Sequence, residues 1–272
     1  MPIVTEYLTR NPCYKSGRTI KVKGLMLHSI GCPQPNPRAF VKNWNSESYN
    51  RACVHGFIGA DETIITLPCM EMAGKAMRGW HGGGSSNNTH IGVEMCEPDC
   101  IKYTGGAGFT TSDAAAAIAF VKKTTANAVE LFARLCLLHN LSPELDIISH
   151  AEGFKMGIAT NHGDPDHLWR GLKMDYDMDS FRRDVAERME EIEEEENEVR
   201  YKQLKDIPEW ARPTIKKLMD ADILGGDGSD PDGNEDIIDL SHDMMRVLIL
   251  NYRGGCFDKQ FIAKGMEPAV KD

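Results

Sequence analysis

The 272-residue sequence lacks the features that define several specialised classes of protein. It has no run of about 18 apolar residues, so we expect no membrane span and no membrane partner. Its first residues, MPIVTEYLTRNP, lack the basic stretch followed by an apolar one that forms a secretory signal. We therefore expect synthesis in a reducing cytosol.

Positive charge and cysteine pairs are also scarce. The chain has 31 Lys and Arg against 41 Asp and Glu, a net charge of −10, so nucleic acid is not an expected partner. Its eight cysteines form no CxxC pair and no dense framework. Because Cys96 and Cys100 also have no histidine at a metal-binding spacing, we expect free thiols rather than a metal site.

Three regions differ in composition. Residues 1–178 are rich in Gly, Asn and His and predict a first domain. Residues 179–203 predict a charged linker helix, in which a thin apolar stripe suits either a solvated linker or a helix paired with its own copy. Residues 204–272 predict a small helical module.

The first region predicts a mixed sheet with helices packed on it. Apolar or alternating runs predict strands at 20–28, 52–58, 63–67, 90–95 and 146–149. Ser112 is expected to cap a long helix that ends near His139, because Asn140 and Pro143 follow. The fold class is therefore α/β, with a central mixed sheet flanked by helices.

Polar side chains stand where the predicted strands end. His28, Glu94 and His150 occupy such positions, and the segment NHGDPDHLW at 161–169 adds His162 and Asp164. A zinc hydrolase needs three N or O ligands, a carboxylate that takes a proton from water and a donor for the oxyanion. The residues alone leave open whether these groups bind a metal or are buried histidines and a turn of purely structural use.

Five segments in a fixed order carry a resemblance to a known family. They are LMLHS at 25–29, VHGFIGADETIITL at 54–67, GWHGGGSSNNTHIGVEM at 79–95, SHAEGF at 149–154 and HGDP at 162–165. The chain resembles the type 2 N-acetylmuramoyl-L-alanine amidases, the family of phage T7 lysozyme and the peptidoglycan recognition proteins. The resemblance covers roughly residues 20–170.

The resemblance implies a role for each candidate residue. His28, His150 and Asp164 would be the zinc ligands, and Glu94 the catalytic carboxylate. His162 would be the oxyanion donor, at a position where the family commonly has Lys. This departure leaves the donor's charge open, because an ordinary His loses its proton near pH 6.5 and Lys only near pH 10.

Several neighbouring residues have more than one interpretation. Asp166 competes with Asp164 as a ligand, but the residue directly before the proline matches the family better. Trp80, His81 and Asn88 are expected to contact substrate, although each also suits a structural turn.

The implied fold has a groove over the zinc ion, and the implied reaction is hydrolysis of the amide between N-acetylmuramic acid and L-alanine of peptidoglycan. A chain without a signal peptide then suggests a phage or prophage endolysin, made in the host bacterial cytoplasm and acting on the cell wall. Two alternatives are a non-catalytic peptidoglycan-binding protein of the same fold and an intracellular muropeptide-recycling amidase.

The C-terminal region predicts two helices, at 206–226 and after a cap at Ser241. This hairpin resembles a single S-layer-homology motif, which implies wall binding. Self-association as a homodimer through residues 180–260 is the alternative. The loop within 227–239 is interpreted as a turn rather than a calcium site, because Gly228 stands where a calcium loop needs Asp.

Overall fold

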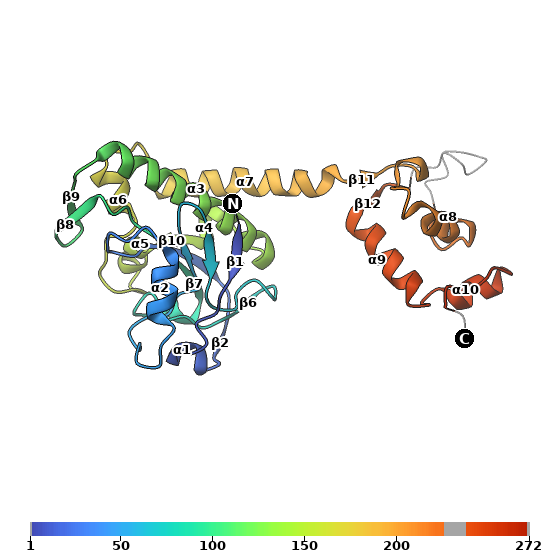
Figure 1. The fold of residues 1–272 in the computed structure, drawn as a ribbon, viewed down its shortest axis with the longest axis horizontal. Helices are drawn as coiled ribbons and strands as arrows, with labels where there is room; N and C mark the ends of the chain where they lie inside the picture. The colour runs from blue at the N-terminus through green and yellow to red at the C-terminus, as the bar shows by residue number, and fades with distance from the viewer. Residues whose placement is uncertain (1, 226–237, 271–272) are drawn as a thin grey trace. The chain divides into compact units, whose positions relative to one another are not determined.

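A six-stranded mixed sheet lies at the centre of the first of two compact units, residues 1–190 and 191–272, in this computed structural model (Figure 1). In spatial order its strands are β1 (Ile3–Thr5), β5 (Thr63–Ile65), β4 (Gly56–Ile58), β7 (His90–Met95), β3 (Gly24–Ser29) and β10 (Ile147–Ser149). Strands β4, β7, β3 and β10 are parallel, β5 is antiparallel to β4, and β1 is parallel to β5. The predicted α/β fold with a central mixed sheet is thus confirmed.

The structure describes residues 2–225 and 238–270, so residues 227–237 of the turn considered for calcium lie outside it. Helices and 3-10 turns of the first unit are α1 (Pro12–Lys15), α2 (Pro37–Trp44), η1 (Ser85–Asn88), α3 (Ala114–His139), α4 (Pro143–Asp146), α5 (His150–Lys155), α6 (Asp166–Gly171) and the first part of α7 (Met178–Glu198). Two further antiparallel pairs accompany them: β2 (Thr19–Lys21) with β6 (Lys75–Met77), which are distant in the sequence, and the hairpin of β8 (Ile101–Gly105) with β9 (Gly108–Thr111). Within the described residues, no helix is both long enough and apolar enough to cross a membrane.

The single strand predicted at 20–28 is two strands. β2 pairs with β6 outside the main sheet, and β3 begins at Gly24 and is buried along its whole length. A Cβ atom at Gly24 would lie 2.6 Å from the carbonyl oxygen of Asp146, so only glycine fits at this point of close approach. Burial on both faces explains why β3 is a nearly continuous apolar run.

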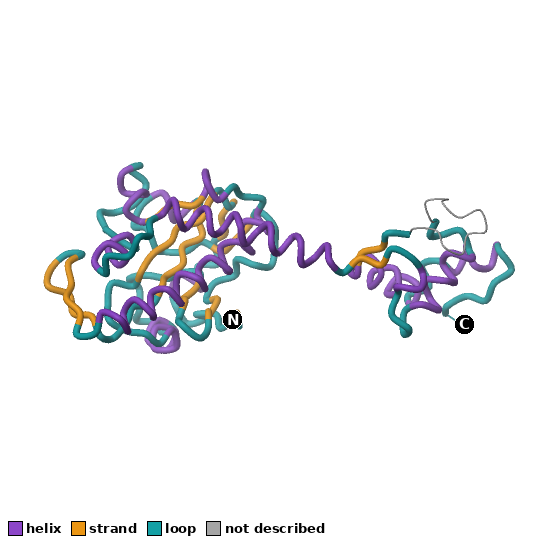
Figure 2. The backbone as a smooth tube through the Cα atoms, turned by 90° about the horizontal axis from the view of Figure 1, so that it is seen from above, coloured by secondary structure: helices purple, strands orange, loops and turns teal. Residues whose placement is uncertain are grey.

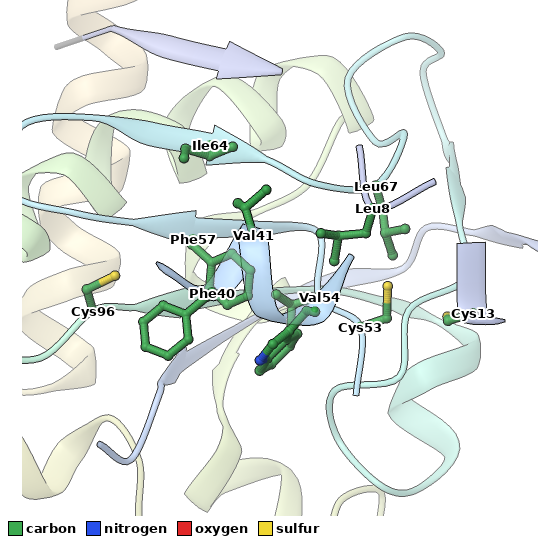
Figure 3. Close-up of a cluster of buried hydrophobic side chains, with 11 residues drawn as sticks. Leu8, Cys13, Phe40, Val41, Cys53, Val54, Phe57, Ile64, Leu67 and Cys96 are labelled. Carbon is green, nitrogen blue, oxygen red and sulfur yellow. The ribbon is translucent and has the colours of Figure 1, made fainter. Parts of the chain in front are cut away.

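Strand register decides which residues share a face of the sheet. His28 of β3 lies opposite Glu94 of β7, and Phe57 of β4 lies opposite the same Glu94. These three residues therefore point to one face. Phe57 stacks on Phe40 of α2 with ring centroids 5.2 Å apart, within the apolar cluster drawn in Figure 3. Helix α2 and the candidate site thus occupy the same side of the sheet.

Helices α3 and α7 lie beside each other in the first unit (Figures 1 and 2). Helix α3 is capped by Asp113, one residue later than predicted, and ends at His139 as predicted, with Asn140 after it in the left-handed conformation. Phe181 of α7 packs on Phe132 of α3 at 5.2 Å, and Arg188 bonds Glu130 at 2.6 Å. The start of α7 is therefore part of the first unit's core, although its stripe resembles that of a solvated linker.

The second unit encloses a small apolar core. Its elements are the pair β11 (Arg200–Tyr201) and β12 (Leu240–Ser241), η2 (Leu204–Asp206), α8 (Arg212–Asp220), α9 (His242–Arg253) and α10 (Asp258–Ala263). Ser241 caps α9 as predicted, and Met245 and Ile249 of that helix are buried.

The first helix of this unit is shorter than the 206–226 predicted. It begins at Arg212, because Pro213 lacks an N–H group and fits only in the first turn of a helix. Residues 209–211 form a turn instead, and Trp210 within it is 58% exposed.

Candidate metal centre

Three parallel strands bring the candidate residues to one edge of the sheet. His28 and Glu94 are register partners near the ends of β3 and β7, and His150 follows β10 directly. In open α/β sheets the carboxyl ends of parallel strands are the usual place for ligands. The spacing of more than 100 residues between the two histidines in the chain is closed by the β3–β10 pairing.

His28, His150 and Asp164 form a compact cluster. The two Nδ1 atoms are 3.0 Å apart, and the Asp164 carboxylate lies 3.3 Å from His28 Nδ1 and 3.7 Å from His150 Nδ1. Ligands held 2.0–2.2 Å from a tetrahedral ion are roughly 3.3–3.6 Å apart. Two imidazole nitrogens and one carboxylate at this separation fit a zinc-like cation. The competing residue Asp166 is not part of the cluster.

A helix start positions His150. Ser149 caps α5: its hydroxyl accepts a hydrogen bond from Glu152 N–H, and the Glu152 carboxylate accepts one from Ser149 N–H. Arg182 of α7 donates to the same carboxylate and to the carbonyl oxygen of Ile147. This reciprocal capping fixes the first residue of the helix, which is His150.

Burial keeps His150 in the form that a metal needs. Removal from water, with the nearby His28 ring as a smaller cause, lowers its pKa to about 4. The ring is therefore neutral at pH 7, and a neutral imidazole offers a lone pair to a cation.

Glu94 is the unsatisfied carboxylate of the site. Its Oε2 atom is buried and has no hydrogen-bond partner among the described residues. Burial, followed by the negative charges of Asp164 and Glu97, raises its pKa well above the ordinary value. A bound cation would offset that repulsion. A carboxylate oxygen without a partner, next to a cluster of candidate metal ligands, is suited to take a proton from a small polar molecule such as water.

An open groove of about 1000 Å³ lies over the cluster. His162 lines it, is exposed, and packs its ring edge-on against His150 with centroids 4.4 Å apart. Trp80 also lines the groove. Asn88 is exposed, accepts a hydrogen bond from Arg78 and is not among the groove residues that the structure describes.

His81 borders the groove but is bonded within the protein. Its Nδ1 lies 3.0 Å from Nε2 of His28, and its Nε2 lies 3.0 Å from the carbonyl oxygen of His90. The expectation of a substrate contact thus gains a competing role, a direct link to the first candidate ligand. The two rings are 53 residues apart in the chain, and no spacing rule predicts that contact.

Sequence reasoning missed a second polar cluster at the groove. Glu97 is fully buried and accepts hydrogen bonds from Gly31 N–H at 2.9 Å and from the Tyr103 hydroxyl at 2.8 Å. That hydroxyl lies 2.6 Å from His167 Nε2. A Glu just after the apolar strand 90–95 is a detectable signal, since buried carboxylates need partners. Its partners on β8 and α6 follow only from the fold.

Comparison with known proteins agrees with the geometry. The sequence profile of the Amidase_2 family, described as N-acetylmuramoyl-L-alanine amidase, matches residues 18–167. Among solved structures, hydrolase AmiA of Staphylococcus aureus in complex with its ligand is 22% identical, with a TM-score of 0.51 over 70% of this chain and 83% of that one. The catalytic domain of XlyA is 20% identical (TM-score 0.47, covering 68% and 99%), and a mutant endolysin from Bacillus subtilis is 20% identical (0.44, 68% and 99%). No curated protein sequence gives a significant match.

The profile match spans more than half of the chain and contains the ends of β3, β7 and β10 together with Asp164. The shared fold with AmiA is consistent with it. The chain therefore belongs to the N-acetylmuramoyl-L-alanine amidase family.

Proposed function

We propose that this protein is a zinc-dependent enzyme that hydrolyses the amide between N-acetylmuramic acid and L-alanine in peptidoglycan. The observation that carries the proposal is the His28, His150 and Asp164 cluster near the unpartnered Glu94 oxygen, with His150, Asp164 and Glu94 lining one groove. A zinc ion held by these three residues would supply Lewis acidity, which would polarise a carbonyl and lower the pKa of water to about 7.

The chain's own residues then have separate tasks. His28, His150 and Asp164 hold the ion, each presenting one ligand atom. Glu94 accepts the proton of the attacking water through Oε2 and later returns it to the leaving amine. A site that raises the pKa of a carboxyl group favours both steps, because the group then binds a proton more strongly and can still release it.

His162 and Trp80 complete the groove. We assign His162 as the donor to the oxygen of the tetrahedral intermediate, since its ring borders the groove beside His150. Trp80 supplies an aromatic wall for the glycan or the peptide stem.

Metal analysis of one substitution tests the proposal. The purified protein should contain one zinc ion per chain and release new L-alanine amino termini from peptidoglycan. His150→Ala should lose both properties while its circular dichroism spectrum stays that of the parent, because removing one ligand destroys the site. Stoichiometric zinc retained in that variant would contradict the ligand assignment.

The substrate's size separates wall lysis from two other roles. A lytic enzyme clears suspensions of whole walls, a recycling amidase cleaves only soluble muropeptides, and a binding protein cleaves neither. A complete ligand set with a free carboxylate oxygen supports an enzyme over a binding protein. We propose the lytic, endolysin-like role, in which residues 191–272 bind the wall or self-associate. Three exposed apolar side chains on α9 support this second part: Met244, Val247 and Leu250.

A further inference from the structure

The glycine-rich segment WHGGG at 80–84 has so far no chemical role apart from bordering the groove. Two hydrogen-bond chains connect it to the candidate metal ligands. One runs from His28 through His81, and the other from His150 through Thr160. Each chain ends at a backbone carbonyl oxygen, that of His90 in the first case and of Gly82 in the second.

The carbonyl at the end of the first chain sets the direction of every bond in it. A carbonyl oxygen only accepts, so His81 Nε2 must carry a hydrogen to bond the His90 oxygen at 3.0 Å. A neutral ring has one N–H, and His81 Nδ1 is then an acceptor. His28 Nε2, 3.0 Å away, must therefore donate to it. The hydrogen of His28 is thus on Nε2, and its Nδ1 has a free lone pair.

The direction of the bonds in the second chain follows in the same way, with the Thr160 hydroxyl as the middle group. The Thr160 hydroxyl donates to the Gly82 carbonyl oxygen at 3.2 Å, so its oxygen is left to accept from His150 Nε2 at 3.3 Å. Thr160 N–H also donates to the Gly82 oxygen at 2.8 Å, which fixes the residue's place. The hydrogen of His150 is again on Nε2.

Both chains leave acceptors facing one another. Two Nδ1 lone pairs lie 3.0 Å apart and face the Asp164 carboxylate, which accepts a hydrogen bond from Ser29 N–H at 3.3 Å. Converging acceptors repel unless a cation lies between them. The hydrogen-bond chains therefore prepare the site for a metal before it binds.

Glycines allow the middle residues to come this close. A Cβ at Gly92 would lie 2.2 Å from the His81 ring, and a Cβ at Gly83 would lie 2.5 Å from Thr160 Cγ2. Asn87 holds the segment by accepting hydrogen bonds from the N–H groups of His81 and Gly82 at 2.9 and 2.8 Å. The glycine-rich segment is thus a scaffold on which the two chains are built.

We propose that His81 and Thr160 are positioning residues that fix both metal-binding imidazoles as their Nε2–H tautomers and so set the affinity of the site. This rests on the proposed function, in which His28 and His150 bind zinc through Nδ1. Partners of this kind contribute about 10–100-fold to metal affinity in other proteins.

Zinc affinity of matched variants tests the proposal. His81→Phe keeps a ring without an acceptor, and Thr160→Val keeps the shape without the hydroxyl. Competition with a chelator should show each binding zinc about 10–100-fold more weakly than the parent. The controls His81→Asn and Thr160→Ser keep an acceptor near the same point and should stay within a few-fold of the parent. Equal affinity in the folded Phe and Val variants would overturn the proposal.

Ring-nitrogen NMR of the unsubstituted protein gives a test that no folding defect can disturb. With zinc or cadmium bound, His28 and His150 should both show metal at Nδ1 and hydrogen at Nε2. Coordination through Nε2 in either ring would overturn the tautomer assignment and leave the amidase proposal standing. A parent protein that binds no zinc at all would instead refute the proposed function itself.

Discussion

The two units differ in what they bury. Every buried polar or charged residue among those the structure describes belongs to the first unit, from Asn11 to His167. The core of the second unit, residues such as Ile215, Met245 and Phe261, is entirely apolar. Buried polar groups cost free energy unless they are paired, so a fold retains them where they act. Among the described residues, the candidate metal centre and all the other buried polar side chains thus belong to the first unit, and the core of the second unit contains none.

The largest effect should come from cutting the chain on either side of residues 179–190. A fragment of residues 1–190 should fold and keep activity on soluble muropeptides, since it contains the whole first unit. A fragment of residues 1–178 should not fold. It lacks Phe181 and Val185, which are fully buried in the first unit. Loss of one buried Phe side chain costs about 3–5 kcal/mol, a large part of the 5–15 kcal/mol that is a typical free energy of unfolding.

Thermal unfolding followed by circular dichroism compares the two fragments. A cooperative transition in residues 1–178 at the temperature seen for residues 1–190 would show that α7 is only a linker. It would also remove the structural reason for drawing the boundary at Glu190.

Substitution of one carboxylate in each unit tests whether the chemistry belongs to the first unit alone. Glu94→Gln should lower turnover about 10²–10⁴-fold with zinc content unchanged, because an amide cannot accept the proton of water. Asp258→Asn is the control: both of its oxygens accept backbone N–H bonds, from Ala269 and Val270, so it is structural. Its turnover should equal that of the parent. A Glu94→Gln variant with more than about a tenth of the parent's turnover would show that Glu94 is not the general base.

Substitution of His162 tests whether this exposed side chain contributes to catalysis as the oxyanion donor. His162→Ala should lower turnover about 10²–10³-fold, the usual loss for one oxyanion donor, while zinc content is unchanged. His162→Lys restores a donor and should recover most of the rate. Initial rates on a soluble muropeptide, measured for the parent and both variants at one pH, show whether His162 contributes to turnover. Equal rates for the Ala variant and the parent would leave His162 without a catalytic role.

Acid should weaken the first unit before the second. Burial, only partly opposed by hydrogen bonds with the backbone of Met77 and Gly92, lowers the pKa of His55 from 6.5 to about 4. Between these values the unfolded chain binds a proton that the folded one does not, so stability falls as pH falls from about 6.5 to 4. The loss from His55 reaches about 3 kcal/mol.

Hydrogen exchange followed by mass spectrometry resolves this difference along the chain. At pH values from 7 to 4.5, adjusted for the intrinsic rates, protection should decrease over strands β4 and β7 and much less over α8 and α9. A parallel decrease in both units would mean that His55 does not govern the acid response.

Much of the site can be predicted from the sequence, because the ends of its buried strands can be recognised in the pattern of apolar and polar residues. Periodicity locates β3, β7 and β10, and polar residues at their ends name His28, Glu94 and His150. Contacts between residues that are distant in the sequence cannot be predicted from such a pattern. The bond of His81 to His28 and the Glu97–Tyr103–His167 cluster depend on tertiary packing, for which the sequence carries no period.

Two helix predictions failed for local reasons that can be named. The helix predicted from residue 206 begins only at Arg212, where Pro213 in the first turn marks the start of α8. The stripe of α7 is thin, but Phe181 fills a place among aromatic rings of the first unit, which a one-dimensional pattern cannot show. The predicted pair of helices in the second unit also omitted η2, α10 and the β11–β12 pair, which are too short to show a period in the sequence.

The pairing of β3 with β7 has a consequence for insertions and deletions in this gene. Strand side chains alternate, so adding or removing one residue within Gly24–Ser29 or His90–Met95 would send His28 or Glu94 to the opposite face. A loop between these strands can change length without that effect, but the segment at 80–84 is constrained as well because it holds His81 against His28. Natural variants should therefore preserve the length of these two short strands and of the segments that carry His81, Thr160 and Asp164, and length changes should accumulate in loops outside them.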